Sequence, residues 1–255
     1  MTDVLDLTEL PAGSRNYRAW VGPAGRFDTL SALQFGLLTT AGLRETHTLL
    51  DIGCGSLRAG RLFLAYLLPG HYFGIEPERW VLQEGIREML GEQFIARRSP
   101  TFIHDDQFTL SAFGRQFDYL LAQSIFSHTT LEQMDRCLGE ARTAMSPESQ
   151  FFATFIPGES DYDGDEWVYP GIVQFKPSTV RAIAARHGLT MRRVAWPHPS
   201  QRWVVFRPQE AGNPPLPPTL RPRGRKIAKL QATVAQQADE LQQQEQQLHR
   251  LRGRS

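Results

Sequence analysis

LLDIGCGSLR, residues 49–58, is the stretch that decides the fold of this 255-residue chain. An apolar run carries the carboxylate of Asp51 near its end, and the chain then turns through Gly53 and Gly55. Beyond the turn, apolar side chains recur at helical spacing as far as Leu67. The pattern predicts a strand, a tight loop and a helix. Because glycine has no Cβ and the helix start offers free N–H groups, a polar ligand can approach this backbone closely.

Two classes of cofactor use a turn of this kind. A dinucleotide site has the pattern G-x-G-x-x-G, whose third glycine allows close contact between helix and strand. Arg58 stands at that third position here, and Asp51 would repel a pyrophosphate. A carboxylate at the end of the strand suits a cationic ligand instead.

The segment resembles motif I of the class I S-adenosylmethionine-dependent methyltransferases. This resemblance implies that Asp51 faces the methionine end of the cofactor, and that the cofactor loop consists of Gly53, Cys54 and Gly55. The chain departs from the family pattern at Leu57, where many members have a further glycine. That departure leaves the shape of the loop open.

A second acidic residue follows the next predicted strand, HYFGI at residues 71–75. Glu76 ends this strand, 21 residues beyond Gly55. In a parallel βαβ unit that spacing places Glu76 beside the first turn, where its carboxylate can accept hydrogen bonds from both hydroxyls of a ribose. Since S-adenosylmethionine and NAD both carry ribose, Glu76 does not choose between them.

Two further segments extend the resemblance. Asp105 and Asp106 follow a short third strand, and the family commonly has an acidic residue here that accepts a hydrogen bond from the adenine amino group. The sequence does not say which of the two has that role. FDYLLAQSIFSH, residues 117–128, resembles motif IV, the strand and loop beneath the transferring methyl group. Gln123 is therefore a candidate residue at the edge of the cofactor.

The periodicity of the remaining chain predicts alternating helices and strands. We expect a Rossmann-like α/β methyltransferase fold with a seven-stranded, mostly parallel sheet that ends in an antiparallel hairpin. This domain would span residues 27–207, behind a leader at 1–26. Helices are expected from Phe27 to near Gly42 and at 57–68, 78–92, 130–145 and 178–187, with later strands at 151–156, 190–196 and 202–206.

The last part of the chain has a different composition. Six of the 15 residues at 208–222 are proline, which predicts an extended linker. In the tail at 223–255, Ile227, Val234, Leu241 and Leu248 recur every seven residues. This heptad predicts a C-terminal coiled coil that forms a homo-oligomer or binds a coiled-coil partner protein. A disordered glutamine-rich tail is the alternative.

Composition excludes several classes of protein. A net charge of +1 predicts no general attraction to nucleic acid, and no apolar run approaches the length of a membrane helix. The N-terminus lacks a signal-peptide core, and the two cysteines form neither a disulfide framework nor a metal-ligand pattern. We expect a cytoplasmic protein without a bound metal.

Motif IV ends at the candidate catalytic residue. A sulfonium methyl group is already activated, so the enzyme needs alignment, exclusion of water and, for a hydroxyl acceptor, a general base. His128 is the candidate base, because an imidazole titrates near neutral pH. A histidine that caps the next helix is the alternative interpretation, and His198 and Glu159 are further candidate bases. The acidic loop at 157–177 is expected to act as a substrate lid.

These observations lead to one function and two alternatives. We expect methyl transfer from S-adenosylmethionine to a hydroxyl of a small molecule or saccharide. A catalytically idle S-adenosylmethionine-binding module, whose coiled coil mediates assembly, is the first alternative. An NAD oxidoreductase is the second, and Asp51 and Arg58 disfavour it.

Overall fold

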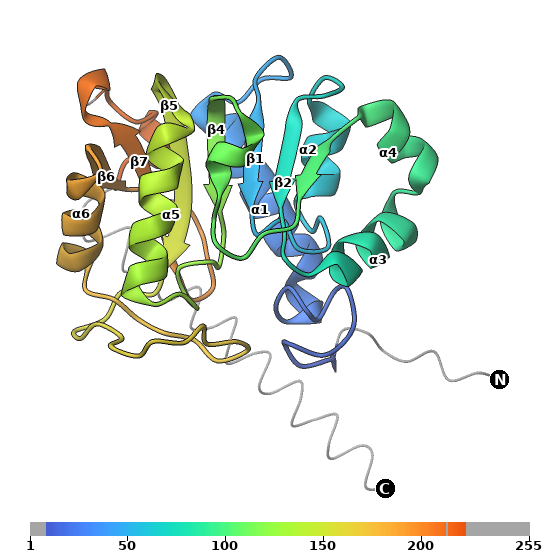
Figure 1. Ribbon diagram of the computed structural model, residues 1–255, viewed down its shortest axis with the longest axis horizontal. Helices are drawn as coiled ribbons and strands as arrows, with labels where there is room; N and C mark the ends of the chain where they lie inside the picture. The colour runs from blue at the N-terminus through green and yellow to red at the C-terminus, as the bar shows by residue number, and fades with distance from the viewer. Residues whose placement is uncertain (1–8, 213, 223–255) are drawn as a thin grey trace, which may run out of the picture. The chain divides into compact units, whose positions relative to one another are not determined.

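The computed structural model describes residues 9–212 and 214–222, and these contain a seven-stranded sheet in the order β3-β2-β1-β4-β5-β7-β6 (Figure 1). The first five strands pair in parallel, and β7 is antiparallel to both β5 and β6. The Rossmann-like sheet with its terminal hairpin is therefore confirmed. The strands are β1 (Leu49–Ile52), β2 (Tyr72–Ile75), β3 (Thr101–Ile103), β4 (Phe117–Ala122), β5 (Met145–Phe155), β6 (Leu189–Arg193) and β7 (Arg202–Pro208).

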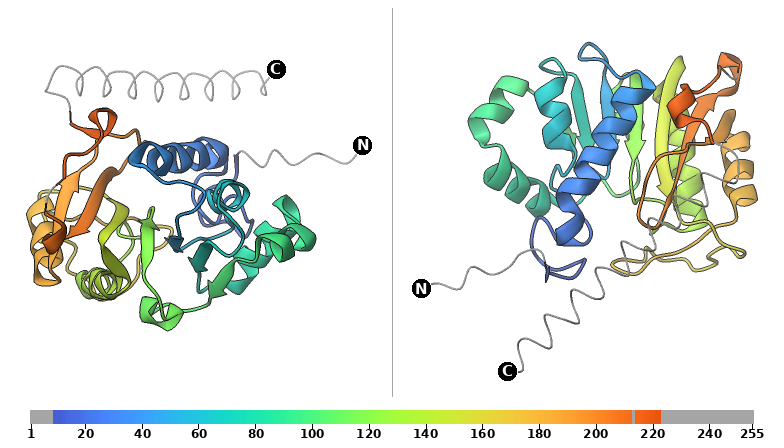
Figure 2. Two further views of the ribbon diagram at one scale, coloured as in Figure 1. Left: turned by 90° about the horizontal axis from the view of Figure 1, so that it is seen from above. Right: turned by 180° about the vertical axis from the view of Figure 1, so that it is seen from behind.

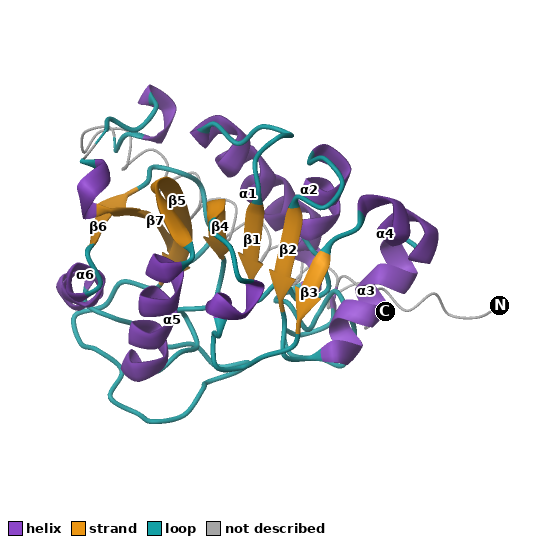
Figure 3. Ribbon diagram, turned by 45° about the horizontal axis from the view of Figure 1, so that its top comes forward, coloured by secondary structure: helices purple, strands orange, loops and turns teal. Residues whose placement is uncertain are grey.

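Helices cover both faces of the sheet, as Figures 2 and 3 show. Successive strand residues point to opposite faces, so Leu49 packs with α1, α2 and α3 while Leu50 packs with α5 and α6. Both faces of the sheet are buried at β1, and this explains the nearly continuous apolar run of the strand. The helices are α1 (Phe27–Ala41), α2 (Gly60–Tyr66), α3 (Arg79–Met89), α4 (Glu92–Arg98), α5 (Leu131–Thr143) and α6 (Pro177–Arg186).

The structure differs from the prediction at α4 and at the boundary between α5 and β5. Helix α4 was not expected. The helix predicted at 130–145 ends at Thr143, and β5 begins at Met145, six residues before the predicted strand. Pro147 lies in β5 where its register with β4 shifts, between the pairs Phe117–Met145 and Tyr119–Gln150. A proline has no N–H to donate, and such an irregular stretch tolerates it.

The proline-rich segment packs against the domain. Leu216 and Leu220 are buried in the same apolar cluster as the side chains of α1. The backbone N–H of Ala195 donates to the carbonyl of Leu220. The described part of this segment therefore covers the domain. The predicted coiled coil at 223–255 and the first eight residues of the leader lie outside the described residues.

Within the described part of the chain, every helix is too short or too polar to cross a membrane.

Candidate active site

The carboxyl ends of the parallel strands open into a cavity of about 740 Å³. Its walls come from the leader, the turn after β1, the loop at 157–177 and the turn before β7. All nine residues singled out from the sequence line it: Asp51, Gly53, Cys54, Gly55, Glu76, Asp105, Asp106, Gln123 and His128. Parallel strands bring their carboxyl ends to one edge of a sheet, and this topology gathers residues that are 77 positions apart in the chain.

The turn after β1 has the backbone that its glycines allow. Gly53 and Gly55 have φ angles of 70° and 55°, and a Cβ there would collide with Ile125 and Val21 respectively. Leu57 also has a positive φ, 63°, although its side chain is fully buried in the core. The loop therefore keeps a left-handed residue where the sequence lacks the expected glycine, and core packing holds it there.

Asp51 lies at the floor of the cavity with 5% of its surface exposed. Its Oδ2 accepts a 2.7 Å hydrogen bond from the Tyr72 hydroxyl. Burial raises the pKa of Asp51 to about 6, against the lowering effects of the Tyr72 hydrogen bond and the Arg58 charge. A cationic ligand beside this carboxyl group would favour its ionised form.

Glu76 lies beside the first turn, as the βαβ spacing predicts. Its two carboxylate oxygens accept hydrogen bonds from the backbone N–H groups of Gly55 (2.9 Å) and Glu78 (3.0 Å). These contacts fix the carboxylate at the cavity wall. Burial raises the pKa of Glu76 to about 7, so an ionised and a neutral form coexist near neutral pH.

The two neighbouring aspartates differ in their local contacts. Asp105 accepts hydrogen bonds from the backbone N–H groups of Gln107 and Thr109 and from the Thr109 hydroxyl. It therefore fixes the turn that leads into the 3-10 helix at Leu110–Phe113. Asp106 accepts a hydrogen bond of 2.8 Å from the side-chain amide of Gln107. Asp106 is thus less engaged in local structure.

His128 is held in one tautomer by the long loop. Its Nδ1 lies 2.8 Å from two carbonyl oxygens, those of Val168 and Gly171. Since carbonyl oxygens only accept hydrogen bonds, Nδ1 carries the proton, and Nε2 of the neutral ring keeps its lone pair. Burial lowers the pKa of His128, against those two hydrogen bonds, so the neutral ring dominates at pH 7.

The two other candidate bases fit less well. His198 also lines the cavity, but both of its ring nitrogens are engaged: Nδ1 accepts from the backbone N–H groups of Ser200 and Gln201, and Nε2 lies 3.0 Å from the side-chain amide nitrogen of Gln123. Burial, together with the charges of Arg58 and Arg26, lowers the pKa of His198 to about 4. Glu159 is exposed and does not line the cavity.

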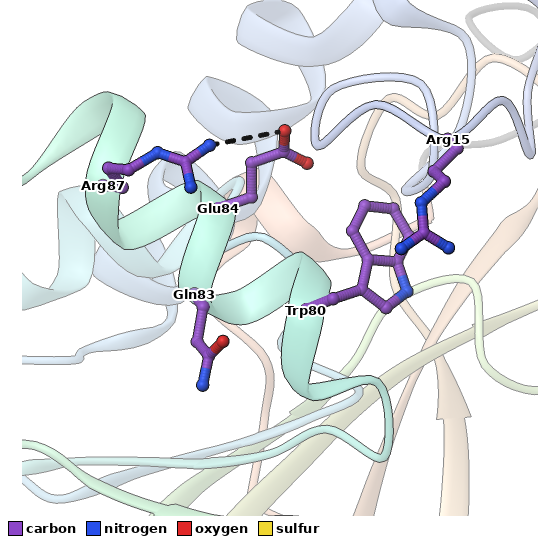
Figure 4. Close-up of a pocket in the computed structure, with 5 residues that line it drawn as sticks. All are labelled: Arg15, Trp80, Gln83, Glu84 and Arg87. Atoms are coloured by element: carbon purple, nitrogen blue, oxygen red, sulfur yellow. Dashed lines mark ion pairs between the residues drawn. The ribbon is translucent and has the colours of Figure 1, made fainter.

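The leader and the loop at 157–177 meet at the cavity. Trp20 packs edge-on against Trp80 of α3, with ring centroids 5.1 Å apart, and its carbonyl accepts a hydrogen bond from the Tyr169 hydroxyl. Figure 4 shows the outer side of this contact, where the Arg15 guanidinium lies over the Trp80 ring, 4.9 Å from its centroid. An ion pair between Glu84 and Arg87 borders the same surface. The leader is therefore anchored to α3.

Arg58 is a residue whose position the sequence reasoning missed. It entered that reasoning only as a departure from a glycine pattern, yet its guanidinium is buried at the cavity wall. It donates to the carbonyl of Val21 and to Oε1 of Gln123, which Gln34 also approaches at 3.0 Å. The signal available in the sequence was a long cationic side chain at the start of the helix predicted at 57–68.

Comparison with known proteins agrees with this geometry. Residues 50–151 match a family model described as a methyltransferase domain. This match covers 102 of the 255 residues of the chain. None of the curated proteins compared matches the sequence.

Solved structures share the fold. Magnesium protoporphyrin IX methyltransferase from Synechocystis PCC 6803, with bound S-adenosylhomocysteine, aligns at a TM-score of 0.54 and 16% identity, over 78% of this chain and 90% of that chain. The glycopeptide N-methyltransferase MtfA, complexed with S-adenosylhomocysteine, gives 0.52 and 14%, over 71% and 90%. Mitomycin 7-O-methyltransferase MmcR gives 0.56 and 19%, over 75% and 56%. The methyltransferase-domain match and the common fold support enzymatic activity for this chain.

Proposed function

We propose that the protein transfers the methyl group of S-adenosylmethionine to a hydroxyl group of a small molecule or saccharide. The observation that carries this proposal is the fixed tautomer of His128, which leaves Nε2 as a proton acceptor in the same cavity as the acidic residues after β1 and β2. Solved proteins with this fold bind S-adenosylmethionine or S-adenosylhomocysteine.

The acidic side of the cavity fits the cofactor. Asp51 would face the positively charged methionine end, and Glu76 would accept hydrogen bonds from the ribose hydroxyls. Asp105 is already engaged by Thr109, which favours Asp106 as the acceptor for the adenine amino group. Cys54 would be a small, neutral residue of the loop, since burial raises the pKa of its thiol. Gln123 would lie at the cofactor's edge.

The other side of the cavity fits the acceptor. The sulfonium needs no further activation, so the chain has to align the hydroxyl with the methyl group and remove its proton. His128 would take that proton at Nε2 while Val168 and Gly171 hold the ring. The Trp167 ring is tilted against the His128 ring, with the two ring centroids 5.5 Å apart. Trp167 is 42% exposed, so its indole offers a flat apolar surface to an acceptor ring.

Two solved neighbours are named as a mitomycin 7-O-methyltransferase and a glycopeptide N-methyltransferase. They support a small-molecule class of acceptor for this chain. The alternative of an idle binding module has no support from these comparisons. Assembly through the tail at 223–255, as a homo-oligomer or with a coiled-coil partner, remains a prediction. A cytoplasmic location is proposed from the two free thiols, Cys54 and Cys137.

The proposal is tested by methyl transfer from methyl-labelled S-adenosylmethionine to a panel of phenols, sugars and glycosides. His128→Asn is the decisive variant, because an asparagine amide can replace the Nδ1 donor toward Val168 and Gly171 but supplies no base. We expect a loss of kcat of roughly 100-fold to 10,000-fold. His47→Gln, at the opposite end of β1, is the control. Full activity of His128→Asn would contradict the assignment of His128 as the general base.

A further inference from the structure

Arg58 is a buried cation whose hydrogen bonds are incomplete. Only 7% of its surface is exposed, and that surface lines the cavity. Its two Nη groups donate to neutral oxygens, the carbonyl of Val21 and Oε1 of Gln123. Its Nε is buried and has no hydrogen-bond partner. Since a guanidinium has five N–H donors, more than half of its capacity is unused in the described residues.

A buried guanidinium without an anion is costly. Burial removes the hydration of the ion, and neutral oxygens offset that loss only in part. Among the described residues, no carboxylate forms an ion pair with Arg58; the Asp51 charge acts on it from further away, and Tyr72 already binds one oxygen of Asp51. Burial lowers the pKa of Arg58 to about 10, so the group stays protonated at pH 7.

The surrounding contacts fix Arg58 in place. The Ser31 hydroxyl of α1 donates to its backbone carbonyl at 2.6 Å. Gln34, one turn further along α1, donates to the same Gln123 oxygen that receives the Arg58 side chain. Helix α1 and the end of β4 thus orient the guanidinium toward the cavity. This arrangement is built for a ligand of opposite charge.

The methionine moiety of S-adenosylmethionine carries two opposite charges on one carbon, an ammonium and a carboxylate. Asp51 and Arg58 present the complementary pair from one wall of the cavity. We propose that Arg58 binds the α-carboxylate of the cofactor while Asp51 receives the ammonium, so that the two residues together recognise an amino-acid zwitterion. This inference rests on the proposed function and adds to it a residue outside the glycine pattern.

The test separates the carboxylate from the rest of the ligand. Calorimetric titration of the full chain with S-adenosylmethionine and with its decarboxylated analogue needs no variant. A charge-assisted, bidentate contact predicts that the intact cofactor binds roughly 10-fold to 150-fold more tightly than the analogue. Equal affinities in the wild-type protein would overturn the assignment.

The variant arm uses Arg58→Met with Arg61→Met as the matched control. Arg61 lies three residues further along the chain, in α2; it pairs with Asp28 and does not line the cavity. We expect Arg58→Met to lose the preference for the carboxylate, with the affinity of the decarboxylated analogue changed less than about threefold, whereas Arg61→Met keeps the preference. If Arg58→Met does not fold, Arg58→Lys, which lacks the bidentate fork, should reduce the preference by about tenfold.

The remaining outcomes each decide one question. Equal weakening of both ligands by Arg58→Met would mean that Arg58 only supports the wall, and would overturn the inference. Unchanged cofactor preference with a raised KM for an acidic acceptor would assign Arg58 to the acceptor instead, and would also overturn it. If the wild-type protein binds neither adenosyl ligand, the proposed function fails first, which is a distinguishable result.

Discussion

The two sides of the cavity are built from different kinds of backbone structure, strand ends on one side and irregular segments on the other. The cofactor side comes from the ends of β1, β2 and β3 and from the turns directly after them, and it carries Asp51 and Glu76. The proposed acceptor side comes from irregular segments: the leader, the loop after β4 that carries His128, the loop at 157–177 and the turn before β7. Regular strands position the first set of side chains, whereas contacts between distant loops position the second.

Burial acts on both sides but with opposite consequences for charge. It raises the pKa values of Asp51 and Glu76 to about 6 and about 7, toward the neutral acid. It lowers the pKa values of His128 and His198, toward the neutral base. The proposed cofactor side therefore gains from a ligand that restores its charge, and the proposed acceptor side holds His128 as the neutral ring, the form that can accept a proton. Substitutions on the two sides should accordingly change different measurements.

After the loss of kcat in His128→Asn, the next largest effect is expected from Glu76→Ala. This change removes the acceptor proposed for both ribose hydroxyls, and two charge-assisted hydrogen bonds predict an affinity for S-adenosylhomocysteine that is lower by roughly 100-fold. Isothermal calorimetry measures it. Glu88→Ala in α3 is the control, because Glu88 pairs with Arg87 and does not line the cavity. An unchanged affinity in Glu76→Ala would contradict the proposed binding of the ribose hydroxyls by Glu76. It would also weaken the distinction between the two sides of the cavity.

A smaller effect is expected from pH. With a pKa of about 7 in the free protein, Glu76 must lose its proton for both of its oxygens to accept hydrogen bonds from the ribose hydroxyls, so cofactor affinity should fall as pH falls from 8 to 6, by about tenfold. Asp51, with a pKa of about 6, adds a further decrease below pH 6. Titrations of wild type and Glu76→Gln across this range measure the difference. A Glu76→Gln variant with the same pH dependence would assign the proton elsewhere.

The same pKa value has a consequence for stability. A carboxyl group whose folded pKa lies above its unfolded value binds protons more tightly in the folded state, so it contributes less stability as pH rises from about 5 to about 8. The free energy of unfolding of wild type relative to Glu76→Gln should therefore fall over that range without ligand. Urea unfolding at pH 5, 6.5 and 8 provides this check.

The smallest effect is expected from Trp167→Ala. Loss of its half-exposed indole should raise the KM of a ring-shaped acceptor by about fivefold and leave the affinity for S-adenosylhomocysteine within twofold. Steady-state kinetics and calorimetry on one preparation give both numbers. Leu68→Ala, at an exposed apolar residue that does not line the cavity, controls for a general loss of apolar surface. A change in cofactor affinity alone would show that the loop belongs to the cofactor side.

The sequence predicted the cofactor side because strand ends are local signals. Asp51 and Glu76 each close an apolar run, and the parallel crossover between them determines that they meet. The tautomer of His128 had no such signal, since it depends on carbonyls about 40 positions away in an irregular loop. The burial of Arg58 was not predicted for a related reason. It depends on contacts with α1 and with the leader, and tertiary packing determines these contacts. The buried Leu216 and Leu220 likewise could not be read from a proline-rich composition.

The most direct test of the central claim is calorimetric titration of the full chain at pH 8 with S-adenosylmethionine, S-adenosylhomocysteine and NAD, for wild type and Asp51→Asn. The charge complementarity of the cavity predicts that both adenosyl ligands bind at one site per chain, that NAD gives no measurable binding, and that Asp51→Asn weakens S-adenosylmethionine by roughly tenfold or more. Absence of binding by both adenosyl ligands, or tighter binding of NAD, would contradict the account.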